Sequence, residues 1–101
     1  MTLLTDAKEL ISDERDWVKG TPLAIREDGT EAHCAIGACN YVALKSDTYS
    51  FGDLRDAYNY LKASLPEDLE RQHVATYNDR PETTHDDIMA LFDRAIEKDN
   101  T

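Results

Sequence analysis

Three histidines, two cysteines and an excess of carboxylates are the residues of this sequence with the most obvious chemistry. His33 and Cys34 are adjacent, which places a base next to a thiol. A thiol is activated only in a positive or polar surrounding, and the residues that follow Cys34 are apolar. We therefore assign no catalytic residue, and an enzyme or small-ligand binder built on His33, Cys34 and Tyr77 is the last of three hypotheses.

The possible metal ligands are spread widely along the chain. A structural zinc site usually shows closely paired ligands, such as Cys-x-x-Cys or His-x-x-x-His. Neither pattern occurs here, and no Gly-x-Ser-x-Gly or phosphate-binding glycine loop is present. The sequence therefore predicts no metal and no cofactor, and it favours a protein that is not an enzyme. The possible ligands considered are His33, Cys34, Cys39, His73 and His85.

The charge balance limits the classes of partner. The chain carries 21 Asp and Glu against 11 Lys and Arg, a formal net charge of -10. Phosphate groups are bound by clustered Lys and Arg, so we expect no direct contact with nucleic acid. An anionic membrane surface is disfavoured for the same reason. The charge favours a protein partner with a basic surface, although solubility alone also explains it.

Many of the carboxylates fall on the outer faces of two expected helices. Rows of this kind can be solvated, can dock a basic partner, or can imitate a phosphate backbone. All three interpretations stay open. The residues of this candidate acidic surface are Asp6, Glu9 and Asp13 near the N-terminus, with Asp86, Asp93 and Glu97 near the C-terminus.

Length and patterning predict one acidic helical domain over residues 1–101. Apolar spacing indicates a mainly α fold, a small irregular bundle of four to five helices around a buried central helix, with one short β-hairpin. The sequence shows neither a signal peptide nor an apolar run long enough for a membrane helix. We therefore expect a cytoplasmic protein with reduced cysteines. The oligomeric state is left open.

The helices are expected at five places. The central one has almost no polar face, and the third carries a stripe that starts at Phe51. Thr2, Ser50 and Thr84 are expected to cap helices, the last two in capping boxes closed by Asp53 and Asp87. The ranges are 3–12, 32–44, 50–65, 66–77 and 84–99, and the hairpin falls at 23–29.

A polar cluster follows Tyr77. Asn78, Asp79 and Arg80 precede Pro81 and predict a turn. The turn could present a recognition surface. It could also be structural, with the Asn and Asp side chains bonded to the backbone and Arg80 paired with a carboxylate.

Several short motifs together resemble an uncharacterised family of small bacterial and phage proteins, known only as a domain of unknown function. The resemblance covers nearly the whole chain, and Tyr77 departs from the tryptophan often found there. It implies a phage or mobile-element setting and brings no activity or catalytic residue. In that setting the expected partner is a host or phage protein with a basic surface, and the expected location is the host cytoplasm if a phage encodes the protein. The motifs are Trp17 with Gly20, the Asp28-Gly29 turn, Cys34-Ala35-Ile36-Gly37-Ala38, Tyr77-Asn78-Asp79, Thr84-His85-Asp86-Asp87-Ile88 and Asp93-Arg94-Ala95-Ile96.

The leading hypothesis is a non-enzymatic protein-binding module of a phage or mobile element that acts through an acidic helical surface. The second is an anti-defence inhibitor that occupies or mimics a nucleic-acid-binding surface of a host protein. Both rest on small size, strong negative charge and the lack of a catalytic pattern, and the phage setting rests on the resemblance.

Overall fold

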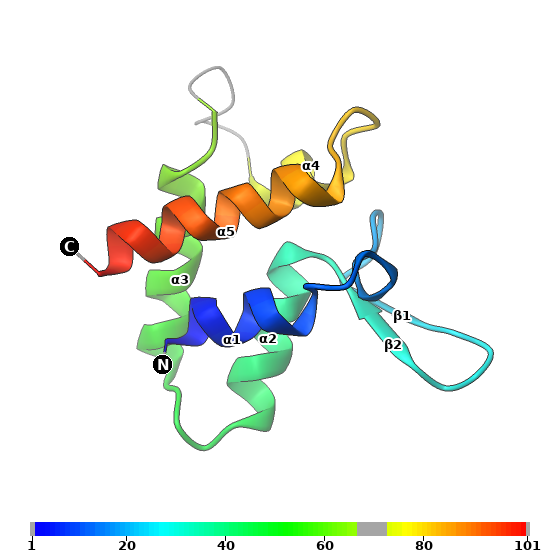
Figure 1. The fold of residues 1–101 in the computed structure, drawn as a ribbon. Helices are drawn as coiled ribbons and strands as arrows, with labels where there is room; N and C mark the ends of the chain where they lie inside the picture. Colours follow the sequence, from blue (N-terminus) through cyan, green and yellow to red (C-terminus); the bar gives the residue numbers. More distant parts are fainter. Residues whose placement is uncertain (1, 67–72, 101) are drawn as a thin grey trace.

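The computed structural model describes residues 2–66 and 73–100. These residues form a mainly α fold with one short antiparallel hairpin, as the sequence predicts (Figure 1). The elements, in chain order, are α1 (Leu3–Leu10), the 3-10 turn η1 (Glu14–Asp16), β1 (Leu23–Ile25), β2 (Glu31–His33), α2 (Ala35–Lys45), α3 (Phe51–Ala63), α4 (Val74–Asp79) and α5 (His85–Asp99).

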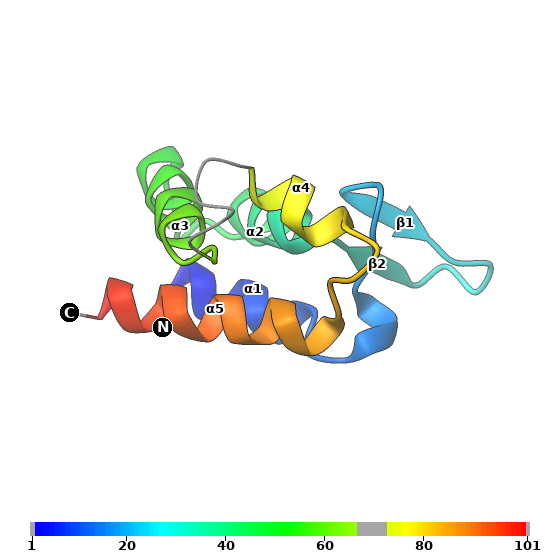
Figure 2. The ribbon, with the colours of Figure 1, turned by 90° about the horizontal axis from the view of Figure 1, so that it is seen from above.

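The helices form two layers. α1 and α5 lie side by side and antiparallel in one layer, and α2, α3 and α4 make up the other (Figure 2). The hairpin projects at the end of the molecule opposite both termini (Figure 1). The resulting shape is flat, with extents of 40 × 35 × 18 Å. Among the described residues, no helix has the length and apolar character needed to cross a bilayer.

The core lies between the two layers. Its largest fully buried apolar side chains include Phe92 and Leu91 of α5, Leu4 of α1, Leu61 of α3 and Ile11 just after α1. The expected central helix is α2, but it is buried only over its first turns, and Leu44 in its last turn is 77% exposed. Phe51, expected on the inner stripe of α3, is 85% exposed. Both expectations of burial were wrong because, within the part of the chain that the structure describes, no other helix lies over this end of α2 and α3 (Figure 1).

The helix starts follow the capping residues in the sequence. Ser50 and Asp53 form one capping box, and Thr84 and Asp87 form another. The Thr2 hydroxyl accepts a hydrogen bond from the backbone N–H of Thr5 and caps α1. Each such cap is worth about 1 kcal/mol. The predicted caps are therefore confirmed, although α1 ends two residues earlier than expected.

The hairpin is longer than the sequence predicts. Leu23 pairs with His33 and Ala24 with Ala32, so the second strand takes residues that were expected to begin the central helix. Gly29 has φ of +86°, a left-handed conformation that glycine adopts at little cost. β2 ends at His33 and Cys34 caps the helix that follows, so α2 begins at Ala35 instead of residue 32.

The polar cluster after Tyr77 is helical at its start. Asn78 and Asp79 are the last residues of α4, and the chain turns only from Arg80 onward. The prediction of a turn at residues 78 and 79 was therefore wrong. Only the last part of the helix expected at 66–77, residues 74–77, is helical among the described residues, and it belongs to α4. Most of its first part, with Glu67, Asp68 and Leu69, lies outside the described residues.

Candidate functional site

The three residues of the enzyme hypothesis are buried on separate elements. His33 ends β2, Cys34 caps α2, and Tyr77 lies in α4. The Cys34 Sγ atom accepts a hydrogen bond from the backbone N–H of Gly37 at 3.2 Å. Burial raises the pKa of the Cys34 thiol, which keeps it protonated and poorly nucleophilic. The hollows described below are lined by none of these three side chains.

The remaining ligand types do not assemble either. Cys34 and Cys39 are both free and buried, and burial raises the pKa of the Cys39 thiol strongly. The His85 Nε2 atom lies 2.7 Å from the backbone oxygen of Ile11, and its ring packs against Trp17. Within residues 2–66 and 73–100, no group of three or more His, Cys, Asp or Glu side chains is placed to hold a metal ion.

Asn78 lies at a buried polar junction between three segments of the chain. Its Oδ1 atom accepts hydrogen bonds from Trp17 Nε1 at 2.6 Å and from the backbone N–H of Ala35 at 3.2 Å. Its Nδ2 atom donates to the Val18 carbonyl and to Asp79 Oδ1, both at 3.0 Å. The side chain is fully buried, and all of these bonds are internal. Asn78 is therefore not on the molecular surface, and its hydrogen bonds join three segments of the chain.

Asp79 and Arg80 extend this polar junction to the loop before the hairpin. Asp79 Oδ1 also accepts a hydrogen bond from the backbone N–H of Gly20 at 2.8 Å, where Gly20 has φ of +83°. Lys19 Nζ donates to the Arg80 carbonyl at 2.6 Å. Arg80 pairs with Glu82 at 2.5 Å. The hydrogen bond to Arg80 lowers the pKa of the Glu82 carboxyl.

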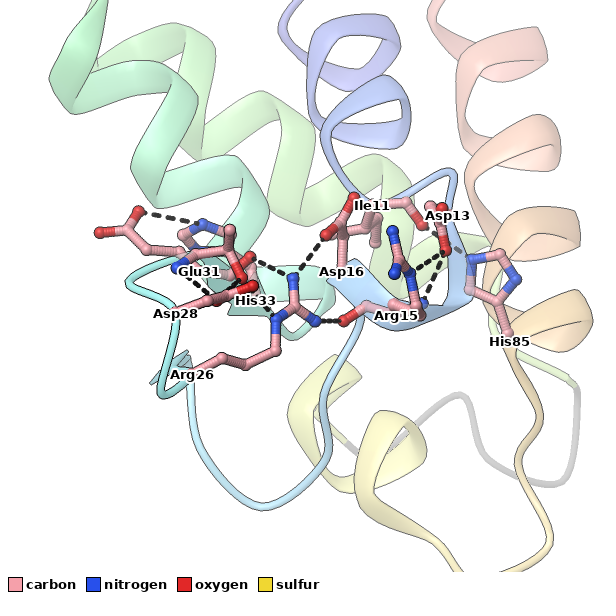
Figure 3. Close-up of polar contacts among 10 residues, drawn as sticks. Ile11, Asp13, Arg15, Asp16, Arg26, Asp28, Glu31, His33 and His85 are labelled. Carbon is pink, nitrogen blue, oxygen red and sulfur yellow. Dashed lines mark hydrogen bonds and ion pairs between the residues drawn. The ribbon is translucent and has the colours of Figure 1, made fainter.

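The hairpin is attached to η1 by a separate polar network (Figure 3). The Arg26 guanidinium donates to Asp16 Oδ1 at 2.8 Å and to the Arg15 carbonyl. At the other face of the hairpin, His33 Nε2 lies 3.7 Å from Glu31 Oε2. Burial lowers the pKa of His33, although the charges of Glu31 and Asp16 oppose that effect. The network orients the hairpin and leaves His33 neutral at neutral pH.

The six residues of the candidate acidic surface divide into two groups. Asp93 pairs with Lys8 at 2.5 Å, Asp13 caps η1, and Asp6 accepts a hydrogen bond from the Tyr49 hydroxyl. Among the described residues, no hydrogen bond or ion pair engages the side chains of the others. Those others are Glu9, Asp86 and Glu97, and all three are exposed.

A hollow with apolar walls lies where α2 ends and α3 begins. Leu44 from α2 and Phe51 from α3 line it together and are 77% and 85% exposed. Both side chains thus present apolar surface to solvent at one place on the molecule. The complete lining is Ala43, Leu44, Tyr49, Ser50, Phe51 and Leu54.

A second, acidic hollow adjoins the first. Tyr49 lines both hollows, and its hydroxyl is held by Asp6. Burial, together with the Asp6 carboxylate, raises the pKa of Tyr49 to about 12, so the hydroxyl stays neutral. Three carboxylates line this hollow, those of Asp53, Asp56 and Asp99, with Thr2, Leu3, Leu4, Thr48, Ala57 and Tyr60 completing it.

Comparison with protein families matches residues 1–98 to DUF6197, a family of unknown function. The chain belongs to this family. No curated protein and no solved structure matches it. In this DUF6197 chain, many of the residues that carry the sequence resemblance meet at or beside the polar junction, among them Trp17, Gly20, Asn78 and Asp79. The hydrogen bonds that these residues make within the fold account for the motifs, and no ligand is needed to explain them.

The residues of the two hollows in this DUF6197 chain were not selected from the sequence. Leu44 and Phe51 carried apolar patterns that predict burial, and Asp53 was interpreted only as a helix cap. One available signal was the mostly polar segment of residues 45–50 between the apolar Leu44 and Phe51. At a short connection of this kind one helix ends and the next begins close by. The side chains at these two helix ends can then be left uncovered by the rest of the fold.

Proposed function

We propose that this chain is a non-enzymatic protein-binding module that contacts its partner through the hollow between Leu44 and Phe51. The exposure of these two large apolar side chains in one hollow carries the proposal. Exposed apolar surface of this kind, with a polar rim, is a mark of protein contact sites. Aromatic anchors such as Phe51 often supply much of the binding energy at such sites.

The proposed partner is a host or phage protein with a basic surface. The net charge of -10 supports this choice, and it disfavours nucleic acid and anionic membranes. The two free cysteines suit the reducing cytoplasm. The phage or mobile-element setting rests on the sequence resemblance and is part of the same proposal.

The anti-defence inhibitor is the second candidate. It would use the carboxylates carried by α1 and α5. These two helices lie in one layer (Figure 2). Lys8 interrupts this row by its ion pair with Asp93, and a phosphate mimic needs dense, regular negative charge. The apolar hollow therefore gives stronger support to a protein contact at the α2–α3 end.

The test is affinity purification from a bacterial lysate with three forms of the protein. The wild type is compared with Leu44→Glu/Phe51→Glu, which places charges in the apolar hollow. Ile25→Glu is the matched control, because Ile25 is also apolar and 68% exposed but lies on β1. Circular dichroism and Trp17 fluorescence establish that all three are folded.

The expected result is an identified protein that the wild type and Ile25→Glu retain and the double variant loses. Its retention should fall as salt increases, because charge contributes to the contact. Equal recovery by all three forms, or recovery of no specific protein by the wild type at low salt, would contradict the proposal. Displacement of a nucleic acid from the captured protein would instead favour the second candidate.

A further inference from the structure

The two adjoining hollows differ sharply in chemistry. The first exposes Leu44 and Phe51, and the second carries three carboxylates. Tyr49 forms a wall common to both. A ligand that fills the apolar hollow therefore has the acidic hollow directly beside it.

The shared wall has a fixed orientation. The Tyr49 hydroxyl donates to Asp6 on α1, so the ring is held at its far end as well as at the backbone. Asp53 is also oriented, because its carboxylate accepts a hydrogen bond from the backbone N–H of Ser50 in the capping box. Preorganised groups lose less conformational entropy on binding. The boundary between the hollows is thus set before a partner arrives.

The acidic hollow keeps most of its negative charge. Of the described residues that line the two hollows, none is Lys or Arg. Arg55 lies 3.8 Å from Asp56, but both side chains are largely exposed, and such pairs are weak. A cation placed beside the apolar hollow would meet complementary charge, whereas a carboxylate there would be repelled.

We infer that the partner presents a peptide segment in which a large apolar side chain and a nearby Lys or Arg occupy the two hollows together. The apolar side chain sits between Leu44 and Phe51, and the cation lies among Asp53, Asp56 and Asp99. This inference rests on the proposed function and adds the chemistry of the segment that is recognised. The apolar contact supplies affinity, and the carboxylates select a basic segment over an acidic one.

The test uses a random library of 12-residue peptides displayed on phage, selected against the folded full-length protein. Enriched peptides are then synthesised and titrated against four forms. Besides the wild type and Leu44→Glu/Phe51→Glu, these are Asp56→Asn/Asp99→Asn and Glu9→Gln/Asp86→Asn. The last two change net charge equally, but Glu9 and Asp86 lie outside both hollows.

The inference expects peptides with Lys or Arg close to a large apolar residue. Binding should be lost in Leu44→Glu/Phe51→Glu. It should weaken in Asp56→Asn/Asp99→Asn by up to about fivefold for each carboxylate, as for exposed charge pairs. The Glu9→Gln/Asp86→Asn control should bind nearly as the wild type does, and replacing the peptide's Lys or Arg with Gln should remove the difference.

Other outcomes separate the two proposals. Peptides that need Leu44 and Phe51 but carry no excess of basic residues, and bind Asp56→Asn/Asp99→Asn unchanged, would overturn this inference alone. Equal weakening in both charge variants would also overturn it, since the effect would then be one of net charge. Peptides that bind the wild type and Leu44→Glu/Phe51→Glu equally would overturn the proposed function as well. So would a dimer in sedimentation that Phe51→Glu dissociates.

Discussion

Gly37 lies against the backbone of Pro22, so closely that a Cβ atom at residue 37 would be 2.0 Å from the Pro22 carbonyl oxygen. The same carbonyl accepts a hydrogen bond from the backbone N–H of Cys34 at 3.3 Å. The loop before β1 is therefore held on the first turn of α2. Only glycine leaves room for this approach, which explains a glycine inside a helix where it costs about 1 kcal/mol relative to alanine.

Gly37→Ala should destabilise the protein. The added methyl group meets backbone, which cannot move away as a flexible side chain would. Overpacking of this kind costs about 1–3 kcal/mol, and we expect the upper part of that range despite the better helix propensity of alanine. Urea denaturation, followed by circular dichroism, measures the loss.

Gly52→Ala is the matched control for that substitution. Gly52 also lies in a helix, but a Cβ there would be 3.5 Å from the Ser50 Oγ atom, an ordinary contact. This variant should be unchanged or more stable by up to about 1 kcal/mol. Equal stability of Gly37→Ala and Gly52→Ala would contradict the close approach to Pro22.

Asn78→Ala should break the polar junction. The substitution removes the partner of the Trp17 and Ala35 N–H groups and of the Val18 carbonyl. Buried groups left without a partner cost about 1–3 kcal/mol each, so we expect a loss of roughly 3 kcal/mol or more. Trp17 is the only tryptophan, so its fluorescence should change in the folded variant.

The control for the junction is Asn59→Ala on α3. Asn59 is exposed, and surface substitutions usually change stability by less than about 0.5 kcal/mol. If Asn78→Ala has the stability and the tryptophan spectrum of Asn59→Ala, the junction does not hold these segments together.

Local signals in the sequence were sufficient for α1, α3 and α5 and for the caps at their starts. A capping box involves two residues three apart, so Ser50 with Asp53 can be recognised without knowing the rest of the fold. The hairpin's second strand was missed because Ala32 and His33 precede an apolar helix, and nothing local distinguishes them from its first turn. Only pairing with Leu23 and Ala24 reveals the strand.

The candidate site depends on contacts that local patterns do not contain. Phe51 continues the spacing of Leu54 and Leu61, yet it is exposed, because no other described helix extends over the first turn of α3. Asn78 has the composition of a turn residue, yet it bonds to residues more than 40 positions away. Where a helix ends relative to its neighbours is a tertiary property, and periodicity in one segment cannot report it.

Cys34 is expected to act as a cap and not as a nucleophile. Cys34→Ser keeps an acceptor for the Gly37 N–H, and serine is among the preferred capping residues. This variant should retain wild-type stability, whereas Cys34→Ala should lose about 1 kcal/mol. Chemical denaturation measures both. Equal losses would show that the Cys34 Sγ bond contributes nothing.

The thiols provide a second measurement on the same cap. Burial raises the pKa of Cys34 and of Cys39, so both should react slowly with a disulfide reagent at pH 8 and quickly in urea. Rapid modification of Cys34 in the folded protein would restore the hypothesis of a reactive site at His33, Cys34 and Tyr77.

His33 should make stability depend on pH in the mildly acidic range. Its pKa is lowered in the folded protein, mainly by burial, so the unfolded chain takes up a proton at a higher pH than the folded one. The neutral ring therefore stabilises the fold above about pH 6.5, its ordinary pKa, and that contribution is lost as pH falls toward the folded-state value.

The measurement is the free energy of unfolding from pH 8 to pH 5 for the wild type and His33→Gln. The variant is expected to start less stable, because it loses the packing of His33 on the Tyr41 ring at 4.7 Å. It should then lose less stability than the wild type as pH falls. The other two histidines occur in both proteins, so their effects cancel in the comparison. Parallel curves would mean that Glu31 and Asp16, whose charges favour the protonated ring, fully offset the effect of burial.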